Sequence, residues 1–413
     1  MRSTLLVSLA LALAACTSRP MAVPEVFQET PSTRFDTERT TTIPAPATTV
    51  DPGTTSPNPE PTGAVVARGD GWELTDVEYE ALVEFVERSH GVSFPDPIKP
   101  QILGTSGVTD LIPPDWEILP KTQWDVLSAL GLTGDQTFQE ANEIRRQRVR
   151  GLCCAETEEG LAVQVEDAGG EAITSVVIVH ELVHAMYTQR PPGGEIPDAA
   201  FSEVLDPLSA ASEGVPQWVA LRYLAGLPAT VQQEMANELP IIRIQDLEAG
   251  MTPAVADVFT FGYNRGAAMA ESLSELGVDP LTELMDRFPA STEQVLFAQA
   301  WIDEELPTET GPIEPPPGFE ATFTGRLGPY ALLLTGATVA PEDQVLELVR
   351  PWAGDSLVMW AEGDAACLAA EVLMDSAEAA SDLATLLDGW AADHGAATVA
   401  VDAAVISLTA CTP

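Results

Sequence analysis

The HExxH sequence at residues 180–184 constrains the fold of this chain more than any other stretch, because it lies inside an apolar run. Residues 174–189 contain no proline or glycine, which predicts a buried helix. Positions i and i+4 of a helix share one face, so His180 and His184 can bind a single metal ion. Glu181 then lies beside the metal, placed to take a proton from a metal-bound water. The simpler alternative is a core helix with two hydrogen-bonded histidines and a solvated glutamate.

A catalytic zinc site needs a third protein ligand and one open position. The acidic candidates downstream are Glu195, Asp198, Glu203, Asp206 and Glu213. We favour Glu213, because it is the single carboxylate of a helical stretch, residues 210–220, that is otherwise small or apolar. Such a group is costly to bury unless it is paired or bound to a metal. The alternative is that Glu213 caps or solvates a helix terminus near Pro216.

With these residues the chain resembles the gluzincins, the thermolysin-like class of zinc metallopeptidases. In that class HExxH lies on one helix and a glutamate ligand lies on the next. The resemblance covers roughly residues 140–300. It implies zinc bound by His180, His184 and Glu213, with Glu181 as the general base of peptide-bond hydrolysis. The fold class that follows is α+β: a mainly helical zincin-like domain with a small sheet, residues 69–310.

A second stretch, residues 261–268, resembles the tyrosine- and glycine-bearing helix that follows the third ligand in several bacterial relatives of this class. The resemblance implies that Tyr263 is a catalytic residue, which donates a hydrogen bond to the oxyanion of a tetrahedral intermediate. Arg265 is an alternative functional residue, which would bind a substrate carboxylate. Ordinary structural roles for both residues stay open.

A third stretch, residues 289–296, is similar to a segment of some secreted HExxH proteins in which a histidine and a proline follow. This chain has Phe297 and Ala298 there, so no role of that histidine is expected. Ser291 and Gln294 also fit a helix capping box, which explains the same residues without chemistry.

The N-terminus predicts export and lipidation. Arg2 precedes a short apolar run, and residues 13–16 match a lipobox that ends in Cys16. The apolar run is shorter than the roughly 20 residues that a membrane-spanning helix needs. We therefore expect residues 1–15 to be a signal peptide and Cys16 to carry the lipid that anchors the protein outside the cytoplasm. The alternative is an ordinary secretory signal in which Cys16 is incidental.

Residues 16–68 are predicted to be a disordered tether. They are rich in threonine, proline, alanine and serine, a composition that buries too little apolar surface to offset the entropy of ordering. The prolines favour an extended chain. The tether would hold the folded part away from the lipid surface.

The first folded elements are predicted from capping and periodicity. Thr75 and Glu78 form the capping box of a helix that runs to about His90. Residues 121–150 predict two helices that are broken at 131–134. The basic cluster at 145–150 is interpreted as a solvated or salt-bridged face, with a lid over the cleft as the alternative. Residues 161–165 alternate like an edge strand. The resemblance to the gluzincins implies that this strand, just upstream of the metal helix, helps to orient substrate backbone.

The last hundred residues predict a small α/β module, residues 311–413. Strands at 355–361 and 366–374 precede a helix at 375–394, and further β-like stretches at 397–401 and 404–408 close the chain. The order suggests a unit packed on or beside the catalytic part. No catalytic residues are expected in it.

Besides Cys16, four cysteines remain, which allow three pairings. We favour a disulfide between Cys367 and Cys411, which would tie the last strand into the C-terminal module. A bridge between the adjacent Cys153 and Cys154 would be strained, and cross-pairing between the two halves stays open.

The net charge of −44 excludes nucleic acid as an expected partner, because phosphates would be repelled. It also disfavours adsorption on an anionic membrane, so attachment should depend on the lipid alone. The expected protein is a monomeric zinc metallopeptidase with a peptide or protein substrate. The main alternative is a binding or assembly lipoprotein of the same fold, and a cell-wall amidase comes next.

Overall fold

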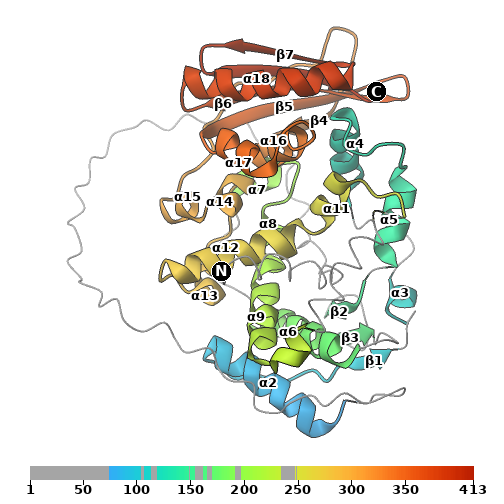
Figure 1. Ribbon diagram of the computed structural model, residues 1–413, viewed down its shortest axis with the longest axis vertical. Helices are drawn as coiled ribbons and strands as arrows, with labels where there is room; N and C mark the ends of the chain where they lie inside the picture. The colour runs from blue at the N-terminus through green and yellow to red at the C-terminus, as the bar shows by residue number, and fades with distance from the viewer. Residues whose placement is uncertain are drawn as a thin grey trace, which may run out of the picture.

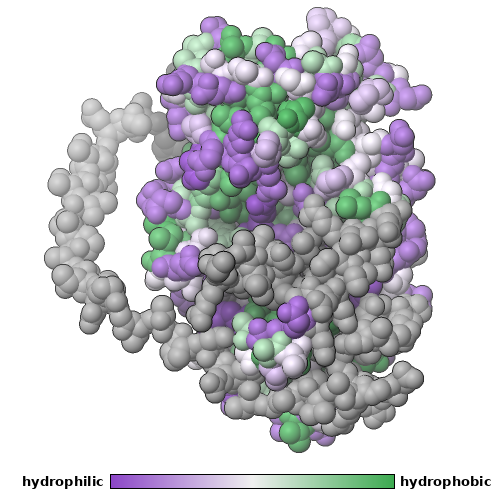
Figure 2. Space-filling view, viewed as in Figure 1, coloured by the Kyte–Doolittle hydropathy of each residue, from purple (hydrophilic) through white to green (hydrophobic). Residues whose placement is uncertain are grey.

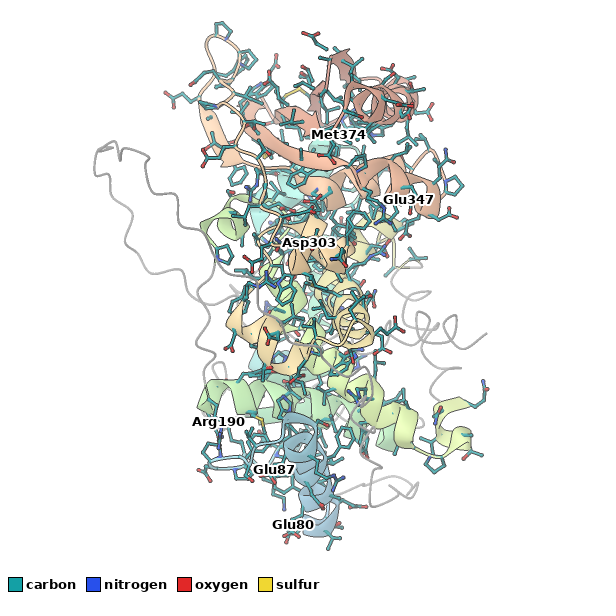
Figure 3. The ribbon with its side chains drawn as sticks, turned by 90° about the vertical axis from the view of Figure 1, so that its left-hand side faces the viewer. Glu80, Glu87, Arg190, Asp303, Glu347 and Met374 are labelled. Atoms are coloured by element: carbon teal, nitrogen blue, oxygen red, sulfur yellow. A yellow bond between two sulfur atoms is a disulfide. The ribbon has the colours of Figure 1, made fainter. Side chains whose placement is uncertain are left out.

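The computed structural model describes residues 74–103, 107–112, 119–147, 149–153, 161–164, 170–190, 197–233, 247 and 249–413. The signal peptide, Cys16 and the tether are predictions that lie outside these residues. The molecule is elongated, with helix α2 and a small sheet at one end and a larger sheet at the other (Figure 1). Figure 3 shows the same axis from the side, with Glu80 and Glu87 at one end, Asp303 between and Met374 towards the other.

The first helices begin where their capping residues predict. Helix α2 spans Asp76–His90, and a capping box between Thr75 and Glu78 closes its first turn. Gly91 ends it with a left-handed φ of 65°, a conformation that glycine adopts without strain. Helices α4 (Lys121–Ala129) and α5 (Phe138–Arg146) are separated as predicted.

Helix α6 (Gly170–Gln189) carries the HExxH residues and lies in the interior. Every residue from 174 to 186 is buried. A helix that is covered on all sides needs neighbours all round. Here these are α2, α9 (Gly214–Gly226) and the strands β2 and β3 of the small sheet.

The small sheet contains β1 (Gln101–Leu103), β3 (Leu161–Gln164) and β2 (Gly151–Cys153), in the order β1-β3-β2. Strand β1 is parallel to β3, and β2 is antiparallel to it. The predicted edge strand is therefore wrong, since β3 is the middle strand. The alternation of residues within β3 could not show whether the strand has one neighbour or two, because both of its neighbours come from other parts of the chain.

The basic cluster is not a solvated face as a whole. Arg145 is only 3% exposed, and its guanidinium donates to the carbonyl of Phe259 at 3.3 Å and lies over the ring of the same residue. Arg146 donates to the carbonyl of Ile112 at 3.1 Å. These arginines bind backbone carbonyls of segments that lie far away in the sequence, and the burial of Arg145 shows that the prediction of a solvated face is wrong for this residue.

Short helices connect the two ends of the molecule. They are α3 (Gly107–Leu111), α7 (Asp198–Ser202), α8 (Leu208–Ser212), α11 (Pro253–Phe259), the π-helix η1 (Gly262–Gly266), α12 (Ala267–Glu275), α13 (Pro280–Asp286), α14 (Thr292–Leu296) and α15 (Ala298–Ile302). The side chain of Ser291 caps α14 by accepting from the amide of Gln294, as the sequence predicts. The predicted capping box is not complete, because Oε1 of Gln294 accepts from the amide of Ala290 instead.

The larger sheet is antiparallel, in the order β4-β5-β6-β8-β7. Its strands are β4 (Ala321–Gly325), β5 (Trp352–Glu362), β6 (Ala365–Met374), β7 (Ala397–Asp402) and β8 (Val405–Cys411), with α18 (Ala377–His394) between β6 and β7. The sequence predicts these elements except β4. Cys367 and Cys411 face each other in β6 and β8 and form a disulfide, which is the pairing that the sequence favours.

The larger sheet packs directly against the helical part of the molecule. Helices α16 (Gly328–Gly336), α17 (Glu342–Val349) and α18 pack together beside it (Figure 1), and α4 contacts β6 and β8. The indole of Trp390 donates to the carbonyl of Leu130 at 3.2 Å, and His394 Nε2 lies 2.9 Å from the carbonyl oxygen of Ala129. One apolar cluster extends through both parts.

The structure combines many helices with a five-stranded antiparallel sheet and a small three-stranded sheet, which is compatible with the α+β class. Hydrophilic residues dominate the outline of the described surface, with apolar residues between them near the larger sheet (Figure 2). Among the described helices, none combines the length and the apolar character that crossing a membrane requires.

Candidate metal centre

Two imidazoles meet on one face of α6. His180 and His184 are one helical turn apart, and their Nε2 atoms are separated by 3.0 Å. His180 is fully buried and His184 is 8% exposed. Because helix geometry alone brings i and i+4 side chains together, this half of the site follows from the spacing in the sequence.

Glu213 approaches the histidines from the break between α8 and α9. Its Oε2 atom lies 3.3 Å from His180 Nε2 and 3.4 Å from His184 Nε2. The sequence predicts Glu213 within one continuous helix, which is wrong, since one helix ends at Ser212 and the next begins at Gly214. The carboxylate makes no capping hydrogen bond, so a capping role does not explain its place.

The three atoms fit a metal ion of zinc's size. Ligand atoms that lie about 2.0–2.1 Å from a tetrahedral zinc ion are separated from one another by about 3.3 Å. The separations of 3.0, 3.3 and 3.4 Å in this cluster are close to that value. His180, His184 and Glu213 are therefore a group that could hold a metal ion.

Burial and charge act in opposite directions on these groups. Burial lowers the pKa of His180 to about 4, although a hydrogen bond to the carboxylate of Glu213 opposes the shift. Burial would also lower the pKa of His184, but the charge of Glu213, a hydrogen bond to Glu213 and the charge of Glu181 together outweigh burial and raise this pKa. The pKa of Glu213 is held well below its usual value by the two histidines, against the effect of burial. The carboxylate is thus ionised, as a metal ligand must be.

Glu181 lies on the same helix and points towards the small sheet. It is 1% exposed, and its carboxylate packs against Gly151 at the start of β2. Its charge contributes to raising the pKa of His184, so it lies close to the metal cluster.

Tyr263 is part of the same cluster. Its ring stacks on that of His180, with the centroids 5.7 Å apart and the planes inclined by 26°. It belongs to η1, and π-helical turns occur frequently at functional sites. Arg265, the alternative, is engaged elsewhere: it forms an ion pair with Glu342 and lies over the ring of Tyr330.

Three glycines let the segment of Tyr263 approach the segment of Glu213. A Cβ atom at Gly214 would meet the backbone of Gly266 at 2.4 Å. A Cβ atom at Gly266 would meet the carbonyl oxygen of Ala210 at 2.2 Å, and one at Gly262 would meet that of Ser209 at 2.6 Å. Since no larger residue fits, these glycines fix the distance between the two segments.

Sequence analysis missed Gln217, which follows Glu213 by one helical turn. Its side chain is fully buried and close enough to His180 to raise the pKa of that imidazole by hydrogen bonding. His180 Nδ1 and the amide of Gln217 are buried, and neither forms a hydrogen bond of regular geometry among the described residues. Metal-bound histidines usually donate their second nitrogen to such a group. The spacing of four residues from Glu213 is the feature of the sequence that could have indicated that Gln217 lies on the same helix face.

Two of the other acidic candidates, Glu203 and Asp206, do not join the cluster. Glu203 accepts hydrogen bonds from Thr292, and Asp206 accepts one from the amide of Leu208. Asp198 begins α7, and Glu195 lies outside the described residues.

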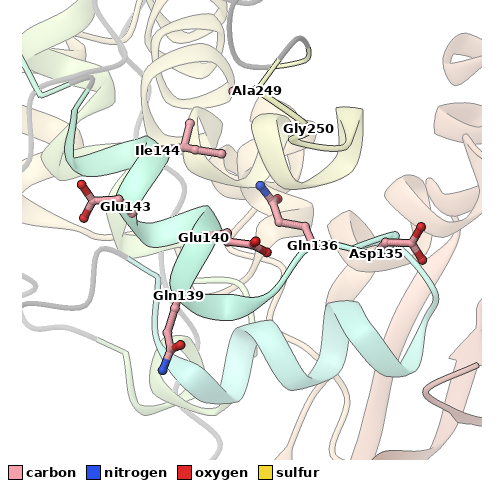
Figure 4. Close-up of a pocket in the computed structure, with 8 residues that line it drawn as sticks. All are labelled: Asp135, Gln136, Gln139, Glu140, Glu143, Ile144, Ala249 and Gly250. Carbon is pink, nitrogen blue, oxygen red and sulfur yellow. The ribbon is translucent and has the colours of Figure 1, made fainter.

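A shallow pocket lies elsewhere, between α5 and the turn at Ala249 and Gly250 (Figure 4). It is lined by carboxylates and amides, among them Glu140, whose side chain is engaged in the capping box with Thr137. It contains no residue of the metal cluster.

Comparison of the chain with protein-family models, with curated proteins and with solved structures finds no match in any of the three.

Proposed function

We propose that the protein is a zinc-dependent peptidase that acts outside the cytoplasm and is anchored by lipid at Cys16. The observation that carries this proposal is the convergence of His180, His184 and Glu213 with Glu181 beside them. A set of two histidines and one glutamate that leaves a position open is typical of catalytic zinc in peptidases. The zincin-like fold belongs to the same proposal, as does the division at residues 310 and 311.

Three ligands from this chain would hold the ion: the Nε2 atoms of His180 and His184, and the carboxylate of Glu213. A bound zinc ion supplies Lewis acidity, which polarises a carbonyl group and makes water a stronger acid. Gln217 would orient His180 through its second nitrogen.

The remaining groups would move protons and bind substrate. Glu181 would accept a proton from water and pass it to the leaving amine, the role of a general base followed by that of an acid. Tyr263 would donate to the developing oxyanion. Strand β2 pairs with β3 on one side only among the described strands, so its other edge is our candidate for pairing with substrate backbone, in place of β3.

The test begins with the metal content of the purified protein and a digest of proteome-derived peptides with and without phenanthroline. Glu181→Gln should keep the bound zinc and lose about 10²- to 10⁴-fold in hydrolysis, the range that general acid–base catalysis contributes. The conservative change keeps the size of the side chain, so unchanged zinc content reports an intact site. Unchanged turnover by this variant would falsify the assignment of Glu181.

The same measurements separate the alternatives. Bound zinc without cleavage of any peptide would favour a binding or assembly lipoprotein. Cleavage of peptidoglycan stem amides but not of peptides would favour a cell-wall amidase.

A further inference from the structure

Strand β2 meets helix α6 at a single glycine. A Cβ atom at Gly151 would lie 2.3 Å from Oε1 of Glu181, 2.8 Å from its Cδ and 3.0 Å from its Cγ. Both residues are buried, and Glu181 is 1% exposed. The volume that any other side chain would need at position 151 is thus taken by the carboxylate.

Backbone conformation does not require this glycine. Gly151 has no left-handed φ, unlike ten other glycines among the described residues. Glycine weakens a strand, and within one it often marks a place where another group approaches closely. The close group here is the side chain of Glu181.

We infer that Gly151 is a positioning residue, which sets where the carboxylate of Glu181 lies relative to the metal cluster. The inference rests on the proposed function, because the position of Glu181 matters only if it acts as the base. Strand β2 is held by pairing Gly151 with Val163 and Leu152 with Ala162 in β3. Helix α6 is buried along residues 174–186, so Glu181 cannot swing into solvent to relieve a contact.

A methyl group at position 151 would therefore displace the carboxylate. Separations below 3.0 Å are essentially never seen for a real Cβ atom, so one partner has to move. The carboxylate is the end of a side chain with three rotatable bonds, while Gly151 is fixed in the sheet. A misplacement of about 1 Å at a reacting group can cost about 10²-fold in rate.

The contact between Gly151 and Glu181 is tested first by measuring thermal stability, which requires no measurement of activity. Gly151→Ala should lower the midpoint of thermal unfolding in the protein with Glu181, because it overpacks the site. In the Glu181→Ala background the same change should lower the midpoint much less, since all three contacting atoms are gone. Equal lowering in both backgrounds would overturn the inference. Gly389→Ala in α18 is the matched control, because nothing lies within 4 Å of a Cβ atom there.

The positioning role is tested by kinetics on zinc-loaded full-length protein. Gly151→Ala should keep the zinc, lose about 10²-fold in kcat and leave KM little changed. Glu181→Asp shortens the side chain by one methylene, so adding Gly151→Ala to it should cost far less than in the parent protein. An active parent whose Gly151→Ala variant is equally active overturns the inference and leaves the proposed function standing. An inactive parent overturns both.

Discussion

Two buried glutamates lie in opposite surroundings. Glu213 is 6% exposed and Glu203 is 5% exposed, so burial alone does not distinguish them. Glu213 faces two imidazole nitrogens, which hold its pKa well below the usual value. Glu203 faces the amide and hydroxyl of Thr292, and burial raises its pKa to about 8.

The partners show why only one of these glutamates is a metal-site candidate. Thr292 donates to both oxygens of Glu203 from its amide and to one of them from its hydroxyl, so this carboxylate is satisfied where it lies. Glu213 instead faces the Nε2 atoms of two imidazoles, which are metal ligands in their neutral form. The lesson is that the chemistry of the neighbours, more than burial, separates a structural carboxylate from a functional one.

Glu203 also marks where the two ends of the molecule join. Its segment pairs with that of Arg326 in an isolated bridge, and its carboxylate packs against Gly328 at the start of α16. Asp355 of β5 accepts from the amides of Leu327 and Gly328 nearby. These contacts give Glu203 a structural role at this junction.

The largest effect should come from exchanging the two glutamates for glutamine one at a time. Glu213→Gln removes an anionic ligand and should weaken zinc binding by more than the 10- to 100-fold that loss of an outer-shell partner costs. Glu203→Gln should leave zinc affinity unchanged, because its partners are hydrogen-bond donors. Competition with a chromophoric chelator measures both. If the two variants bound zinc with equal affinity, Glu213 would not be a metal ligand in any sense in which Glu203 is not.

A smaller effect is expected from Gln217. Gln217→Leu should weaken zinc binding by about 10- to 100-fold, because His180 loses the group that orients it. Gln217→Glu keeps an acceptor and is the control, with affinity close to that of the parent. Competition with the same chelator measures the zinc affinity of both variants. If Gln217→Leu binds zinc as tightly as the parent, Gln217 contributes nothing to binding, and the site consists of its three ligands alone.

A further effect, on stability and not on zinc binding, is a pH dependence at Glu203. Its pKa is about 8 in the folded protein and about 4.3 in the unfolded chain, so the folded state binds more protons between these values. The contribution of Glu203 to the free energy of unfolding is therefore largest below about pH 4, and it decreases as the pH rises towards 8. Glu203→Gln removes this titration and should make stability in that window less dependent on pH.

Urea unfolding at about pH 5 and about pH 8, with chelator present, measures the difference. Glu293 shares the window, since burial raises its pKa to about 8 as well, so some slope should remain. Glu80→Gln on the surface of α2 is the control (Figure 3). A slope in Glu203→Gln as steep as in the parent would show that Glu203 does not titrate differently on folding.

Local patterns determined what lies within one element. The spacing of His180 and His184, the capping box of α2 and the strands and helix between β5 and β8 were predicted from the sequence, because a few residues fix each of them. The favoured disulfide partners also lie opposite each other in neighbouring strands.

Only the tertiary structure decided what joins distant segments. Five carboxylates were chemically equivalent candidates for the third ligand, and packing of α8 and α9 against α6 brings Glu213 alone to the histidines among those described. The middle position of β3, the burial of Arg145 and the contact of Gly151 with Glu181 likewise depend on partners far along the chain. Helix and strand periodicity fix which side chains share a face, but only packing between faces fixes which groups meet.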